Sequence, residues 1–151
     1  MDRMKRASSY MVVGACLFLA AAVPLKQANS QPAAPLALSY EFFKDKVQPI
    51  FLFKRPGHAR CVVCHTFNNA PFKVVRLSPG STTWTEEQSR QNFQLVQKVA
   101  QPGFEGSKLV VHPLAEEAGG DPHHGGGQQF SSKDDPEWLT LKAFVLGATL
   151  K

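Results

Sequence analysis

The residues Cys61-Val62-Val63-Cys64-His65 decide what this chain can fold around. Two thiols three positions apart, followed at once by an imidazole, form the pattern that attaches a c-type haem. Each thiol can form a thioether with one vinyl group of the porphyrin, and the ring of His65 then reaches the iron as its proximal ligand. The motif therefore predicts one covalently attached haem c, held by Cys61, Cys64 and His65.

Two other kinds of site use the same residue types. A thioredoxin-like dithiol needs its cysteine pair to open a helix after a strand, but a basic loop with a Pro-Gly turn precedes this motif. A structural zinc site needs two ligands besides the cysteines, and His65 with His112 or His124 can supply them. Haem is favoured over both because the predicted export signal and the order of the predicted elements, described below, agree with it.

Residues 1–30 have the order of a secretory signal peptide. Basic residues lie in the first six positions, an apolar run covers residues 10–25, and small side chains at Ala28 and Ser30 favour cleavage after position 30. An uncleaved membrane anchor is the alternative, because the run is only slightly short for a spanning helix. A lipoprotein site at Cys16 is less favoured, since the apolar run continues beyond it. Haem is attached outside the bacterial cytoplasm, so signal and motif both predict a periplasmic or otherwise extracytoplasmic protein.

Composition argues against nucleic acid as a partner. The whole chain has 17 Lys and Arg against 12 Asp and Glu, and the first 30 residues hold four of the bases and one of the acids. The mature chain keeps 13 bases against 11 acids, a net charge near +2 that gives nucleic-acid binding no support. Cys16 would leave with the signal, so no cysteine remains for a disulfide framework.

The first helix is predicted after an extended linker over residues 31–38. The Ser39 hydroxyl can cap this helix, and Pro49 removes one amide hydrogen bond, so a kink or a helix end is expected within residues 48–51. The residues that share its apolar face are Phe43, Val47 and Ile50.

Two later segments also have helical signals. Residues 85–100 begin with capping-box spacing and are followed by a Pro-Gly stop. The last helix is predicted to start at Asp135, with Pro136 in its first turn and Gly147 after its end. Its apolar stripe consists of Trp138, Leu141, Phe144 and Val145.

The order of these features resembles a small class I cytochrome c. An aromatic first helix, the haem motif, loops, an amphipathic helix, a glycine-rich loop and an aromatic last helix follow one another over residues 39–151. The resemblance implies an all-α cytochrome c domain whose N- and C-terminal helices pack around a covalently attached haem. It further implies that Phe43 or Val47 packs against Trp138, Leu141 or Val145.

The sixth iron ligand departs from that family. Most class I cytochromes use a late methionine, but all three methionines of this chain lie in the predicted signal. A histidine is therefore expected, and His124 lies where the family places its methionine, beside three glycines that let backbone approach a porphyrin. His112 is the alternative distal ligand. His123 is expected to face outward, because successive residues of an extended chain point in opposite directions.

These features predict a monohaem, bis-histidine electron carrier of low potential rather than an enzyme. The alternatives are a haem enzyme or small-gas sensor with a labile sixth ligand, and a cytochrome subunit of a larger membrane complex. The expected partners are redox proteins, and a membrane is involved only through an uncleaved N-terminus or such a complex. Lys54, Arg55 and Arg60 can pair with haem propionates or guide an acidic redox partner.

Overall fold

The computed structural model describes residues 36–67, 70 and 72–151. The predicted signal peptide, its alternatives and most of the 31–38 linker lie outside these residues. Within them the chain forms helices and loops, with no strand and one isolated bridge between Leu114 and Phe130, which confirms the all-α prediction. In the same part of the chain, no helix is both long enough and apolar enough to cross a membrane.

The first helical segment runs without a break through α1 (Tyr40–Phe42), η1 (Phe43–Val47) and α2 (Gln48–Leu52). Ser39 caps it as predicted, because its hydroxyl accepts a hydrogen bond from the Phe42 amide at 3.2 Å. The irregular stretch is the π-helical turn η1, which lies before the range expected from Pro49, whereas Pro49 itself lies within the α-helical α2. The helix ends at Leu52, one residue beyond the expected range.

The longest helix, α4 (Glu86–Ala100), begins with the predicted capping box. The Thr85 hydroxyl accepts from the Gln88 amide at 3.2 Å, and the Gln88 side-chain oxygen accepts from the Thr85 amide at 3.1 Å. Two amide hydrogens of the first turn are thereby satisfied. Gln101 adopts a left-handed conformation, with φ of 42°, and ends the helix before Pro102.

The last helix, α6 (Pro136–Val145), also begins and ends as predicted. The Asp135 carboxylate accepts hydrogen bonds from the amides of Glu137 and Trp138 at 2.9 and 3.3 Å. Gly147 follows with a φ of +87°, a conformation that favours glycine. The predicted apolar stripe is buried over its whole length: Trp138, Leu141, Phe144 and Val145.

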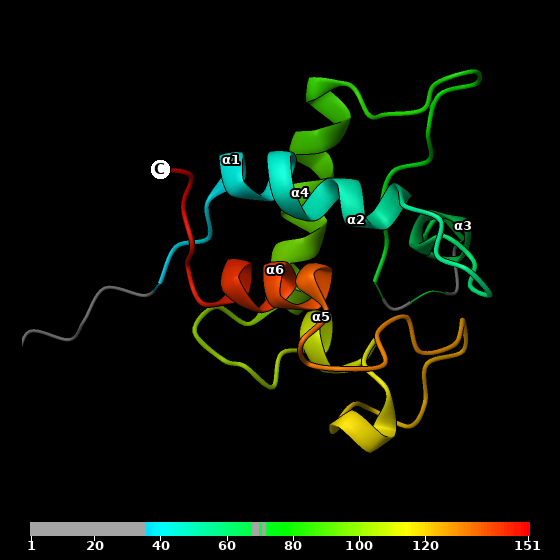
Figure 1. The fold of residues 1–151 in the computed structure, drawn as a ribbon. Helices are drawn as coiled ribbons and strands as arrows, with labels where there is room; N and C mark the ends of the chain where they lie inside the picture. The colour runs from blue at the N-terminus through cyan, green and yellow to red at the C-terminus, as the bar shows by residue number, and fades with distance from the viewer. Residues whose placement is uncertain (1–35, 68–69, 71) are drawn as a thin grey trace, which may run out of the picture. The chain divides into compact units, whose positions relative to one another are not determined.

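The first and last helices pack together, as the resemblance implied. The η1 turn contacts both α4 and α6, and Figure 1 shows the first segment crossing α4. Aromatic contacts join the two helices: the Phe144 ring lies 5.9 Å from that of Phe43 and 6.5 Å from that of Phe42, centroid to centroid. Trp138 instead donates its indole N–H to the Val110 carbonyl, at 3.0 Å, in α5 (Lys108–Val111). The prediction was thus right about the helices but missed Phe144 as the aromatic partner.

The remaining elements of the described chain are α3 (Cys61–His65), α5 and η2 (Glu116–Ala118). The motif forms α3, which packs against α2, while α5 packs against α4 and α6. The segment that leads from α5 to α6 contains only the 3-10 turn η2. This loop-rich segment carries the predicted distal histidine.

Candidate functional site

The motif side chains project from a single short helix. Val62 is buried and anchors α3 in the core, whereas Cys61 is half-buried and Cys64 is exposed. Both thiols are free, and His65 ends the helix in a half-buried position. One short helix therefore holds two thiols and one imidazole at the edge of the core.

The surroundings of Cys61 disfavour the dithiol alternative. Burial raises the pKa of the Cys61 thiol to about 11. The reactive cysteine of a thioredoxin-like site instead has a lowered pKa, because the thiolate is the attacking species. For zinc, no group of three or more histidine, cysteine or acidic side chains able to hold a metal ion occurs among the described residues. The ligand set that the zinc alternative requires is therefore not gathered there.

His65 is oriented by the loop that follows the motif. Its Nδ1 lies 2.8 Å from the Phe72 carbonyl oxygen, and the Phe72 ring packs 4.9 Å from the imidazole, centroid to centroid. The Val74 amide donates to the His65 carbonyl at 2.8 Å, which ties the two segments together. A carbonyl can only accept, so Nδ1 carries the hydrogen and Nε2 keeps its lone pair for a metal.

His124 has the same tautomer but is held by a turn. Its Nδ1 lies 2.5 Å from the Gly127 carbonyl oxygen, and the Gly127 amide donates to the His124 carbonyl at 2.9 Å. Gly127 has a φ of +79°, which a residue with a Cβ rarely adopts. His123 is exposed, as expected from its position beside the half-buried His124.

The two imidazoles have a spacing that suits one shared metal. Their ring centroids are 6.2 Å apart, and their planes differ by 21°. For two imidazoles on opposite sides of one metal, a metal–nitrogen bond of about 2.0 Å and about 1.1 Å from that nitrogen to its ring centre give about 3.1 Å on each side, or about 6 Å between the ring centres. The separation of His65 and His124 agrees with that value.

Burial also keeps His124 in the protonation state that metal binding requires. Desolvation lowers the pKa of His124; the Gly127 carbonyl opposes this shift, and the neighbouring His112 and His65 reinforce it. The net result is a pKa below the ordinary histidine value. A neutral imidazole at neutral pH can act as a ligand.

Two cavities adjoin this histidine pair, and both are lined by Cys61, His65, His112 and His124. One measures about 350 Å³ and the other about 230 Å³. Such walls, largely apolar with a few polar groups, suit a large flat cofactor. The larger cavity is completed mainly by apolar side chains: Ile50, Phe51, Phe72, Leu109, Phe130 and Leu141. The smaller one is more polar and includes Arg60, Gly125, Gly126 and Gln129.

His112, the alternative distal ligand, lies beside His124. The two ring centroids are 4.8 Å apart, with the planes inclined at 70°. Its Nδ1 lies 3.1 Å from a carboxylate oxygen of Asp121. The structure thus brings the rings of His65, His112 and His124 together.

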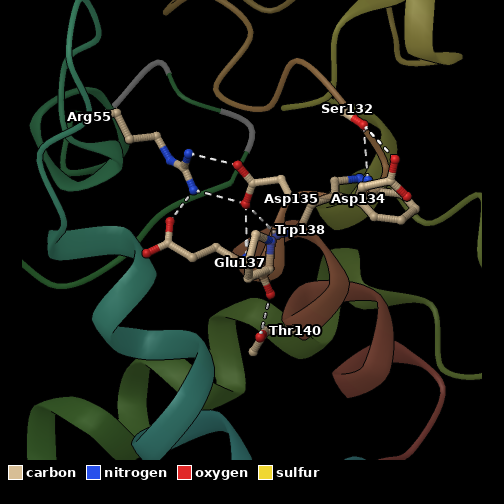
Figure 2. A network of polar contacts seen from close by, with 8 residues as sticks. Arg55, Ser132, Asp134, Asp135, Glu137, Trp138 and Thr140 are labelled. Atoms are coloured by element: carbon tan, nitrogen blue, oxygen red, sulfur yellow. Dashed lines mark hydrogen bonds and ion pairs between the residues drawn. The ribbon is translucent and has the colours of Figure 1, made fainter.

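Arg55 is engaged within the protein rather than free for a propionate or a partner. Figure 2 shows its guanidinium pairing with Asp135, at 3.1 Å, and with Glu137. The guanidinium also lies 4.4 Å from the centroid of the Phe130 ring. Burial raises the pKa of Asp135, but the hydrogen bonds from Arg55 and from two helix amides outweigh this and lower it. Arg55 therefore anchors the loop before the motif to the start of α6, whereas Arg60 is exposed and lines the smaller cavity.

Sequence reasoning did not find the groups that orient the two imidazoles. The Phe72 and Gly127 carbonyls carry no sequence signal, because every residue has a carbonyl. Asp121 had a weak signal, since an aspartate before a proline often accepts from the amide two positions ahead. Its Oδ1 accepts from the His123 amide at 3.2 Å.

No protein-family model, curated protein or solved structure matches this chain significantly. Support for a function comes from the residues and their geometry.

Proposed function

We propose that this protein is a periplasmic monohaem c-type cytochrome that carries single electrons, with His65 and His124 as axial ligands. One observation carries the proposal. The Cys61–His65 helix presents two thiols and an imidazole, and a second imidazole with the same tautomer lies 6.2 Å from the first. The predicted signal peptide supports the location, and the contact between the first and last helices supports a class I cytochrome c fold.

Covalent attachment would use Cys61 and Cys64. Each thiol adds across one vinyl double bond: a sulfur–carbon bond forms, and the thiol hydrogen goes to the other vinyl carbon. Because the two cysteines lie on one helical turn that ends at His65, attachment also places the proximal imidazole. The two thiols and the imidazole all belong to this five-residue helix, so none of them comes from a distant segment of the chain.

The haem, when bound, supplies an iron that alternates between the ferrous and ferric states. His65 and His124 would hold that iron through their imidazoles, and the largely apolar lining of the larger cavity would limit its access to water. Two imidazoles donate more electron density than an imidazole and a thioether, so the ferric state is favoured. We expect a lower potential than that of a His/Met cytochrome of similar fold.

The contacts of His124 favour a carrier over an enzyme or gas sensor. A labile sixth ligand would have to leave the Gly127 carbonyl and the ring of His112 together. A ligand held from two sides keeps the iron six-coordinate and closed to small molecules.

A pyridine haemochrome assay tests the proposal. The full chain is produced with a cytochrome c maturation system, and one covalent haem per chain with two thioethers is expected. Cys61→Ala and Cys64→Ala should each leave at most one thioether, and the double variant should retain no covalent haem. A wild-type protein without covalent haem overturns the proposal.

A further inference from the structure

A polar cluster lies next to the proposed sixth ligand and is centred on Asp121. One carboxylate oxygen accepts from Lys108 Nζ at 2.6 Å and from His112 Nδ1 at 3.1 Å, and the other accepts from the His123 amide at 3.2 Å. The Asp121 amide donates to the Val111 carbonyl at 3.0 Å. Asp121 therefore binds the end of α5 to the loop that carries His124.

The cluster reaches His124 through the ring of His112. That ring packs against the His124 imidazole at a centroid distance of 4.8 Å. Its hydrogen bond to Asp121 restricts rotation about the Cβ–Cγ bond, so the orientation of the His112 ring depends on Asp121. Besides this ring contact, the His124 side chain has one described hydrogen bond, to the Gly127 carbonyl.

We propose that Asp121 is a positioning residue for the sixth iron ligand. It holds His112 by a hydrogen bond, and His112 in turn holds His124 in the orientation that faces His65. The inference rests on the proposed function. Polar groups that orient metal-bound histidines commonly change metal affinity or activity by about 10- to 100-fold when removed.

Asp121 makes more hydrogen bonds, and is more buried, than a residue of an ordinary surface ion pair. Lys108 is two-thirds exposed, and an ion pair with such a partner adds little to stability. The carboxylate itself is only 16% exposed, and its three hydrogen bonds hold its pKa well below its usual range. Asp121 therefore stays an acceptor for His112 across the physiological pH range.

The experiment uses the haem-loaded full chain and measures the rate of carbon monoxide binding to the ferrous protein. Asp121→Ala should raise this rate by about 10-fold or more, because His124 leaves the iron more easily. Ferric electron paramagnetic resonance spectra should show a second low-spin species from altered imidazole orientations. His112→Ala should have a similar effect, and the double variant should add nothing further, because both residues act through one contact.

Matched controls separate positioning from general stability. Lys108→Gln removes the exposed ion pair but leaves the Asp121–His112 bond, so the rate should change less than about twofold. Glu86→Gln disrupts another exposed ion-pair group, with Lys44 and Arg90 on the first helix and α4, and should leave the rate unchanged. If Asp121→Ala does not fold, His112→Phe keeps an aromatic ring there without the bond to Asp121 and should itself raise the rate.

The results distinguish this inference from the proposed function. A wild-type protein with covalent haem and two-imidazole spectra, combined with unchanged rates in Asp121→Ala or His112→Phe, overturns the inference alone. Fully additive effects of Asp121→Ala and His112→Ala also overturn it, since they would place the two residues on separate paths. Absence of covalent haem in the wild type overturns the proposed function itself.

Discussion

His65 and His124 present the same chemical group in two different ways. Each imidazole donates its Nδ1 hydrogen to a backbone carbonyl and leaves Nε2 free. His65 ends a helix whose other members include both thiols, whereas His124 lies in a loop between η2 and α6. The proximal group is therefore placed by consecutive residues, and the distal group by contacts with segments that are distant in sequence.

This difference predicts how each side fails. If the proposed haem is bound, the proximal side combines the ligand, both thioethers and α3, so damage there should disturb the cofactor and the part of the core built around it. The distal side depends on Asp121, His112 and a glycine turn, so damage there should release the sixth ligand and leave the haem attached.

The largest effect is expected from His65→Ala. In so small a domain the proposed haem would form a large part of the core, so loss of the proximal ligand should remove most of the folded state. Thermal unfolding followed by circular dichroism and haem absorbance checks this. A cooperative transition like that of the wild type would show that folding does not depend on the cofactor.

His124→Ala should leave covalent haem in place but remove the low-spin, two-imidazole signal from the ferric spectrum. His123→Ala is the matched control, because His123 is the exposed neighbour and should change nothing. If the two-imidazole signal persists in His124→Ala, the distal assignment is wrong and His112 becomes the candidate.

Asp135→Ala tests the anchor of the proximal side. The substitution removes the cap of α6 and one partner of the half-buried Arg55, so the free energy of unfolding should fall by about 2 to 4 kcal/mol. Asp135→Asn keeps a capping side chain and should cost less. Urea unfolding of both variants measures the difference, and equal losses would mean that the capping hydrogen bonds contribute nothing beyond the ion pair.

The contribution of Asp135 should also depend on pH. Its pKa is lowered in the folded protein, so its charge adds stability that is fully present above the unfolded value of about 3.9. That stability is lost as the pH falls through the folded-state value. The advantage of the wild type over Asp135→Asn should therefore be constant at neutral pH and shrink below about pH 4. A constant difference down to acid pH would contradict this role.

The smallest effect is expected from Gly120→Ala, at the base of the distal loop. A Cβ at this position would lie 2.0 Å from the Leu114 carbonyl oxygen, so the loop must shift. We expect a loss of about 1 to 3 kcal/mol and faster carbon monoxide binding. Unfolding free energies and binding rates equal to those of the wild type would contradict this expectation.

The sequence by itself determined the features whose signals are local. The Ser39 and Asp135 caps, the capping box before α4 and the apolar stripe of α6 all follow from residues within a turn or two of one another. The three predicted attachment residues also lie within five positions. Such features depend on short-range hydrogen bonding and helical periodicity, which the order of side chains already contains.

Only the tertiary structure decided which groups meet across the chain. Phe144 packs against Phe43, and the Trp138 indole donates to the Val110 carbonyl. Arg55 forms ion pairs with the carboxylates of Asp135 and Glu137 at the start of α6. The orientation of His124 likewise depends on the Gly127 carbonyl and on the ring of His112, and the sequence indicates neither contact. Side-chain order cannot specify such contacts, because they arise only when loops bring distant segments within hydrogen-bonding distance.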